Sequence, residues 1–235
     1  MFLTSIAQTA ARATRAAGRP SARLMTVTVA LAGATALVPS TSMAATQEDK
    51  TQFSVTAGSL SFSTVPALPT LGAVTLNGSA QTTNSTMTNF GVADATGSGS
   101  GWNVTVEGQT GVGKSAVFAQ YCGKAKCGAD SEGYVGAGAT LPANSLTLNS
   151  TGGSFSAQGG TTGTAPTLQC STACNVDHAT AVKIASAAAA AGMGTWLTTG
   201  FSGTSLALST PSTLKLLANE EVYRVNLLWT LGTGP

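Results

Sequence analysis

The chain has 235 residues, a formal net charge of +2 and only 9% charged residues. Four of its 11 Lys and Arg residues lie before residue 24, so the chain after residue 44 has seven basic against nine acidic residues, a formal charge of −2. A chain without a basic stripe is not expected to bind nucleic acid.

The first 44 residues predict an export signal peptide. Four arginines precede an apolar stretch over 24–38, and Ser42-Met43-Ala44 satisfies the small-x-small cleavage rule. The apolar stretch is shorter than the roughly 20 residues that span a bilayer, and no later segment reaches that length. We expect cleavage near Ala44 or Ala45; a retained N-terminal anchor is the alternative. The arginines are Arg12, Arg15, Arg19 and Arg23.

Residues 45–52 form a polar leader, and 53–235 predict one all-β domain, a sandwich or barrel-like fold with Gly/Thr-rich loops. We expect a hairpin over 53–63, a loop or edge at Pro66 and Pro69, and loop-like structure over 107–145 and 150–163. Residues 182–186 favour a strand, although the following alanines also permit a helix. The other expected strands are 74–76, 86–92, 102–107, 146–148, 194–200, 205–209, 214–217 and the last segment.

The last segment has the clearest pattern. Residues 223, 225, 227, 229 and 231 are all apolar, whereas the alternate positions are mostly polar. A period of two predicts a strand with one buried face. The same test places Trp102, Val104 and Val106 together on one face of an earlier strand.

The four cysteines, Cys122, Cys127, Cys170 and Cys174, all follow the export signal. An even number of cysteines outside the cytoplasm indicates two disulfides. Three pairings are possible, and we favour the local one, Cys122–Cys127 with Cys170–Cys174. A zinc site is the alternative, but its ligands usually have tighter spacing.

The segment Gly108–Ser115, GQTGVGKS, matches the phosphate-binding pattern G-x-x-x-x-G-K-[ST]. That motif needs a buried parallel strand before it and a helix N-terminus after it. The preceding strand instead alternates apolar and polar residues, and only 116–121 could be helical before Cys122-Gly123. We therefore expect a glycine-rich loop and no bound nucleotide.

Other candidate chemistry is sparse. His178 is the only histidine, and Asp177 beside it raises the hypothesis of a secreted hydrolase, although no serine can be selected as nucleophile. Asp130 and Glu132 supply too few oxygens for a dedicated calcium loop. We expect solvated loop charges and a non-enzymatic protein without cofactor or metal.

Two tryptophan segments carry a family resemblance. GSGSGWNVTVEG, ending at Gly108, and YRVNLLWTLGTGP, residues 223–235, resemble the two signature regions of WxL-domain surface proteins. The matching positions are the lead Gly101, the internal Trp102 and Val104, the distal Trp229 and Leu231, and the supporting Tyr223 and Trp196. The four cysteines and the long Thr/Gly-rich loop depart from that pattern and indicate a divergent member.

The resemblance implies a secreted β-sandwich-like domain that associates non-covalently with peptidoglycan, sometimes with a WxL-interacting surface protein. LPTLG at 68–72 does not match the sortase pattern, so we expect no covalent wall anchor. The motif tryptophans either contact the wall or, as their shared apolar faces favour, belong to the core. A structural or adhesive subunit that assembles with a partner or with itself is the alternative function.

Overall fold

The computed structural model describes residues 48–128, 132–218 and 221–235. The chain divides into two units, Met1–Gln52 and Phe53–Pro235. The expected signal peptide lies outside the described residues. In the described part of the second unit the fold is all-β as predicted, with one four-residue helix, α1 (Lys124–Cys127). The strands are β1 (Leu60–Thr64), β2 (Gln81–Ser85), β3 (Gly91–Asp94), β4 (Trp102–Gly108), β5 (Ala119–Cys122), β6 (Gly133–Tyr134), β7 (Leu146–Leu148), β8 (Ser154–Gln158), β9 (Thr167–Leu168), β10 (Cys174–Asn175), β11 (Val182–Ala187), β12 (Gly194–Thr199), β13 (Leu206–Thr210), β14 (Val222–Arg224) and β15 (Leu227–Thr233).

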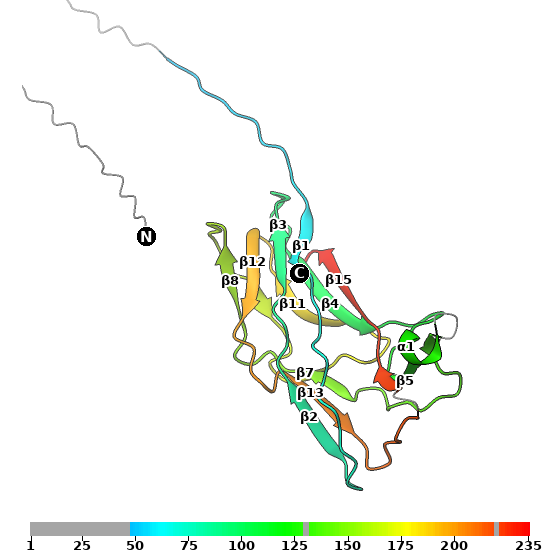
Figure 1. The fold of residues 1–235 in the computed structure, drawn as a ribbon. Coiled ribbons are helices and arrows are strands. Elements are labelled where there is room, and N and C mark those ends of the chain that lie inside the picture. Colours follow the sequence, from blue (N-terminus) through cyan, green and yellow to red (C-terminus); the bar gives the residue numbers. More distant parts are fainter. Residues whose placement is uncertain (1–47, 129–131, 219–220) are drawn as a thin grey trace, which may run out of the picture. The chain divides into compact units, whose positions relative to one another are not determined.

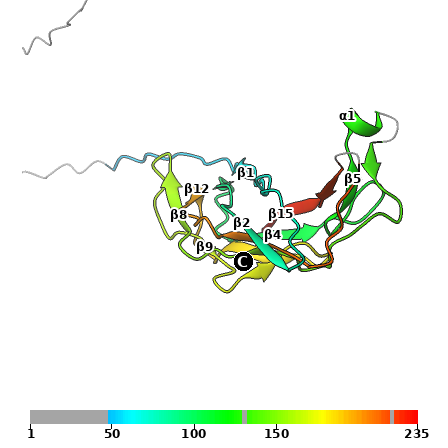
Figure 2. The ribbon, with the colours of Figure 1, turned by 60° about the horizontal axis from the view of Figure 1, so that its bottom comes forward.

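These strands form four antiparallel sheets (Figure 1). Their strand orders are β1-β3-β12-β8, β10-β7-β13-β2, β15-β4-β11-β9 and β14-β5-β6. None of the four sheets closes into a barrel within the described part of the chain. Both views place β5 and α1 on one side of β4 and β15, away from β8 and β12 (Figures 1 and 2).

The core centres on β4, which lies between β15 and β11. Trp102, Val104 and Val106 are fully buried, and the residues between them are partly exposed, as the period of two predicts. Burial of each large apolar side chain stabilises the fold by about 1.5–3 kcal/mol. Because both neighbours of β4 are antiparallel to it, this strand is not the parallel strand of a nucleotide-binding fold.

The predicted hairpin over 53–63 is wrong. Only its second half is a strand, and β1 pairs with β3 instead of with residues 53–57. The backbone of Gly58 donates to the Ala95 carbonyl at 2.9 Å and that of Ala95 donates to the Ser59 carbonyl at 3.1 Å, so the chain continues straight alongside the residues after β3. Phe53 and Val55 are consequently left 89% and 81% exposed.

Several other boundaries also differ from the prediction. Residues 74–76 and 214–217 are not strands, and the expected strand over 86–92 forms only from Gly91, after β2 has ended at Ser85. The expected loop over 150–163 contains β8, which pairs along its length with β12, and 107–145 contains β5, α1 and β6. The strands expected at 146–148, 182–186, 194–200 and 205–209 are present as β7, β11, β12 and β13. The Ala-rich segment is therefore a strand followed by a turn.

The single strand predicted at the C-terminal segment is divided between two sheets. β14 pairs with β5, and after Val225 and Asn226 the chain continues as β15, which pairs with β4. The alternation persists through the change of sheet: the odd positions 223–231 are partly buried, whereas Val222, Arg224, Leu228 and Thr230 are exposed. The apolar face of β15 is thus only half covered.

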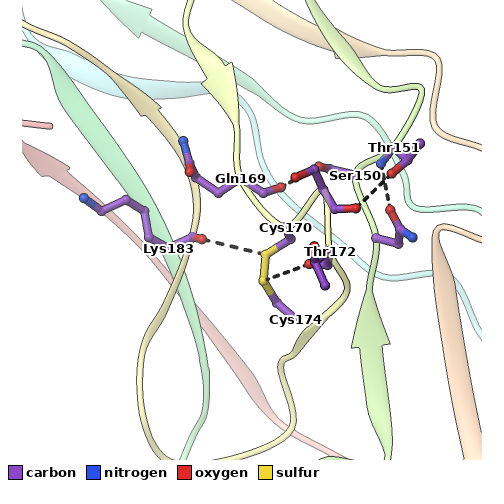
Figure 3. Close-up of a disulfide and its surroundings, with 9 residues drawn as sticks. Ser150, Thr151, Gln169, Cys170, Thr172, Cys174 and Lys183 are labelled. Atoms are coloured by element: carbon purple, nitrogen blue, oxygen red, sulfur yellow. Dashed lines mark hydrogen bonds between the residues drawn. A yellow bond between two sulfur atoms is a disulfide. The ribbon is translucent and has the colours of Figure 1, made fainter.

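Two disulfides follow the local pairing, Cys122–Cys127 and Cys170–Cys174. Figure 3 shows the second, whose Cys170 Sγ lies 3.8 Å from the Lys183 carbonyl oxygen, while the Ser150 hydroxyl donates to the carbonyl of Gln169. Each bond closes a short loop, between β9 and β10 in one case and between β5 and α1 in the other. The four sulfur atoms that a zinc site would use as ligands are therefore bonded in pairs as disulfides.

Candidate functional site

The two tryptophan motifs lie on neighbouring strands. In the antiparallel register of β4 and β15, Leu231 is directly opposite Val104, Trp229 is opposite Val106 and Thr233 is opposite Trp102. Directly opposite residues share one face of a sheet. The third positions of the two motifs therefore lie opposite each other, and Trp102 and Trp229 lie two residues away from them in opposite directions along the pair.

Trp102 is a core residue with a satisfied indole. Its ring is fully buried, and Nε1 donates to the Gly192 carbonyl at 3.1 Å. Two glycines permit this close packing: a Cβ at Gly192 would lie 2.7 Å from Nε1, and a Cβ at Gly101 would lie 2.3 Å from the Ala187 carbonyl oxygen. Both have positive φ, +70° and +74°, which also favours glycine. Gly101 thus has a steric reason to precede the motif tryptophan.

A chain of aromatic rings connects Trp102 with Trp229. Trp102 packs edge-on against Phe155 with centroids 5.9 Å apart, Phe155 packs edge-on against Phe90 at 6.0 Å, and Phe90 contacts Trp229 at 6.2 Å. Phe155 belongs to β8 and Phe90 immediately precedes β3, and these two strands share one sheet. Both tryptophans belong to the sheet of β4 and β15, so the rings join the two sheets. Such pairs contribute about 0.5–1.5 kcal/mol each beyond area burial.

Trp229 is only partly buried, because its strand borders a groove. The groove has a volume of about 580 Å³, within the range of small-ligand sites. Three parts of the chain line it: the proline-containing segment 66–71, the C-terminal segment from Arg224 to Trp229, and the buried side chains of Phe118, Leu146 and Leu208. Sequence reasoning identified Trp229 here but missed Arg224, Phe118 and Leu227, whose proximity results from the change of sheet at Asn226.

Arg224 lies at one side of this groove, beside two tyrosines. Its guanidinium carbon is 4.3 Å from the centroid of the Tyr121 ring, and Tyr121 packs edge-on against Tyr134 at 5.2 Å. The hydrogen bond from the Tyr121 hydroxyl to Glu132 (2.8 Å) raises the pKa of Tyr121, and burial raises that of Tyr134. Both phenols are therefore neutral hydrogen-bond donors at neutral pH.

Asn226 anchors the change of sheet to the glycine-rich loop. Its N–H donates to the Ser115 carbonyl at 2.9 Å, its carbonyl accepts from Gln109 N–H at 2.7 Å, and its Oδ1 accepts from the Tyr134 hydroxyl at 2.5 Å. No helix begins at Ser115; the next element in the described chain is β5. The segment Gly108–Ser115 thus holds the C-terminal segment and lacks the helix that a phosphate-binding loop requires.

Asp177 and His178 do not form a catalytic pair. The fully buried carboxylate of Asp177 accepts backbone N–H groups of Ser145 (3.0 Å) and Leu146 (2.9 Å), whereas His178 Nδ1 accepts from Thr180 N–H at 3.1 Å. Burial raises the pKa of Asp177, although these hydrogen bonds oppose the shift. A triad needs the carboxylate on one imidazole nitrogen, and here it holds the start of β7 instead.

The remaining predicted residues have structural partners. Trp196 is buried in β12 and its Nε1 donates to the Met193 carbonyl at 3.0 Å; Tyr223 in β14 donates from its hydroxyl to the Lys215 carbonyl at 3.0 Å. Cys122 and Cys127 lie with Glu221 in one group whose possible ligand atoms are within 4.8 Å, but both sulfurs are already bonded to each other. Asp130 lies outside the described residues.

Comparison with known families gives one match. The model of the family described as "WxL domain surface cell wall-binding" matches residues 39–235, most of the chain. In the other two comparisons, no curated protein and no solved structure matches the chain. Among the described residues, no helix is both long and apolar enough to cross a membrane.

Proposed function

The chain belongs to the WxL-domain family of surface cell-wall-binding proteins, and from this premise we propose that it binds peptidoglycan non-covalently through the groove beside Trp229. One observation carries the assignment of the site: of the two motif tryptophans, only Trp229 lines an open groove, whereas Trp102 is completely buried. The internal motif then acts through β4, which fixes the position of β15. Val104 and Leu231 lie opposite each other between the two tryptophans in this pairing.

We further propose that residues 1–44 are removed as a signal peptide on secretion, that 45–52 are a polar leader, and that 53–235 form the wall-binding domain. The division of the chain into compact units after Gln52 supports the last boundary. A non-enzymatic role is consistent with the separate hydrogen-bond partners of Asp177 and His178. The binding energy would come from burial of apolar groove surface, at roughly 25 cal/mol per Å².

A sedimentation assay with purified sacculi tests this proposal. The wild-type protein is expected to pellet with sacculi, and Trp229→Ala to pellet about tenfold less at the same concentration, a loss of about 1.4 kcal/mol. Val112→Ala serves as control, because Val112 is fully exposed in the glycine-rich loop and outside the groove. Wild-type protein that remains in the supernatant would end the wall-binding proposal, and a folded Trp229→Ala variant that pellets normally would move the site elsewhere.

The exposed segment before β1 supports a second candidate function, assembly with a partner surface protein or with another copy. Phe53 and Val55 alternate with polar residues, are almost fully exposed and make no hydrogen bond to the described chain. Extended segments of this kind can add to a free sheet edge. Sedimentation velocity of the wild type against Phe53→Ser/Val55→Ser tests it: concentration-dependent assembly that the double substitution abolishes would support this function, and a monomeric wild type would refute self-assembly.

A further inference from the structure

Most of the side chains that line the groove beside Trp229 are apolar, and one is charged. Among its lining residues Arg224 is the only charged one, and Thr70 is the only one with a hydroxyl. These apolar side chains would bury small apolar groups of a ligand, and the one charged side chain would attract a group of the opposite sign. The groove therefore favours a ligand with small apolar groups and an anionic group.

Arg224 is prepared for an anion by its surroundings. Its guanidinium is stacked on Tyr121, and no carboxylate of the described residues lies within 4.0 Å of it. Two acidic residues that immediately precede strands β6 and β14 have other partners, since Glu132 accepts from the Tyr121 hydroxyl and Glu221 accepts from Gln120 Nε2 at 2.6 Å. The planar fork of donors of a guanidinium matches the two oxygens of a carboxylate.

We propose that this groove binds the peptide stems of the wall polymer, with a stem carboxylate on Arg224 and small aliphatic side chains against Leu68, Leu227 and Trp229. The inference rests on the proposed wall binding and names the part of peptidoglycan that is recognised. Charge complementarity selects this occupant, because the only arginine after the leader is at the groove and no acidic residue of the described chain lines it. A wall polymer of polyol phosphates shares the anionic charge, but its backbone carries no aliphatic side chains that would pack against the leucines of the groove.

Three ligands separate these possibilities on the exported protein. The first is intact sacculi free of secondary polymers, the second is the glycan strands that an amidase releases from these sacculi, coupled to beads, and the third is the released peptides, used as free acids or after amidation of their carboxylates. Poly(glycerol phosphate) is the competitor for the phosphate alternative. We expect the protein to pellet with intact sacculi and little of it to pellet with the glycan-coated beads. Competition by the free acids should be at least about tenfold stronger than by the amides, since charge-assisted bonds are about twice as strong as neutral ones.

Substitutions then locate the carboxylate site. Arg224→Gln is expected to weaken peptide binding about tenfold. Arg224→Lys is expected to weaken it less, because a lysine keeps the charge but lacks the planar pair of donors. The control is Lys124→Gln, at an exposed position on α1, which is expected to leave peptide binding unchanged. Circular dichroism would show whether Arg224→Gln folds. If it does not fold, the comparison of free-acid with amidated peptides on the wild-type protein still tests whether a carboxylate is recognised. Equal pelleting with the glycan-coated beads, or stronger competition by poly(glycerol phosphate), would overturn the inference while wall binding stands. Absence of pelleting with intact sacculi would refute the proposed function itself.

Discussion

The two motif tryptophans each occupy the first position of a W-x-V or W-x-L motif, but Trp102 is buried and Trp229 is partly exposed. Trp102 lies on a strand with partners on both sides, and its indole N–H is satisfied inside the core. Trp229 lies on the edge strand β15, and one side of its ring faces the groove. The same residue pattern therefore gives a structural anchor on the central strand and a candidate contact surface on the edge strand. A pattern of W-x-V or W-x-L alone does not distinguish these roles.

The largest expected effect comes from removing each ring in turn. Trp102→Ala should lower the free energy of unfolding by about 3–5 kcal/mol, because it leaves a cavity at the end of the aromatic chain. Trp229→Ala should cost only about 1–2 kcal/mol, since its ring is already partly hydrated. Chemical denaturation monitored by far-UV circular dichroism measures both. Equal losses would mean that the two environments are energetically alike and would break the comparison.

A smaller effect is expected at the glycine that accepts the Trp102 N–H. In Gly192→Ala the new Cβ would lie 2.4 Å from the Ala187 Cβ and 2.7 Å from the Trp102 Nε1, at a φ of +70°. We expect a loss of about 2–4 kcal/mol from overpacking and backbone strain together. Gly97→Ala is the matched control, because its φ is +67° but nothing lies within 4 Å. It should cost only about 1 kcal/mol, and thermal unfolding of both variants would show whether packing contributes.

The smallest expected effect is a pH dependence of stability at Asp177, which accepts the N–H of Leu146, a residue that lines the groove. Burial raises the pKa of Asp177, so over the range from its ordinary value, about 4, up to its folded value the folded chain binds more protons than the unfolded chain. This residue's contribution to stability should therefore fall as pH rises through its folded pKa. Unfolding of the wild type relative to Asp177→Asn, measured across that range, checks the sign. A difference that grows with pH would show that the two backbone hydrogen bonds outweigh burial.

How much the sequence predicts depends on whether a local pattern is sufficient. Alternation over 102–107 predicts β4 correctly, because a central strand buries one set of side chains completely. The strand β8 was missed because Ser154–Gln158 contains a single large apolar residue, Phe155, and owes its place to pairing with β12. Conversely, the apolar runs 74–76 and 214–217 suggested strands, whereas both line an irregular groove of about 500 Å³.

The candidate site was predictable only in part. Trp229 could be identified by its motif, and Arg224 had a signal as the only arginine after the leader. The groove itself could not be predicted, because the residues that line it come from segments that are brought together only by tertiary structure. The change of sheet at Asn226, which brings Arg224 and Trp229 to one groove, depends on hydrogen bonds to a loop more than a hundred residues earlier.

The pairing of β4 with β15 sets the order in which the chain can fold. The Asn103 amide donates to the Gly234 carbonyl across 131 residues of sequence, and the Gly234 N–H returns a bond to Gly101. Contacts between such distant residues are slow to form, because the loop between them loses entropy before any contact compensates for it. A nascent chain that has reached β13 already contains Trp102 and β11 but not β15, the strand on the other side of β4. Completion of the sheet around Trp102 therefore waits for residues 227–234 to be synthesised, and until then the central strand keeps an open edge.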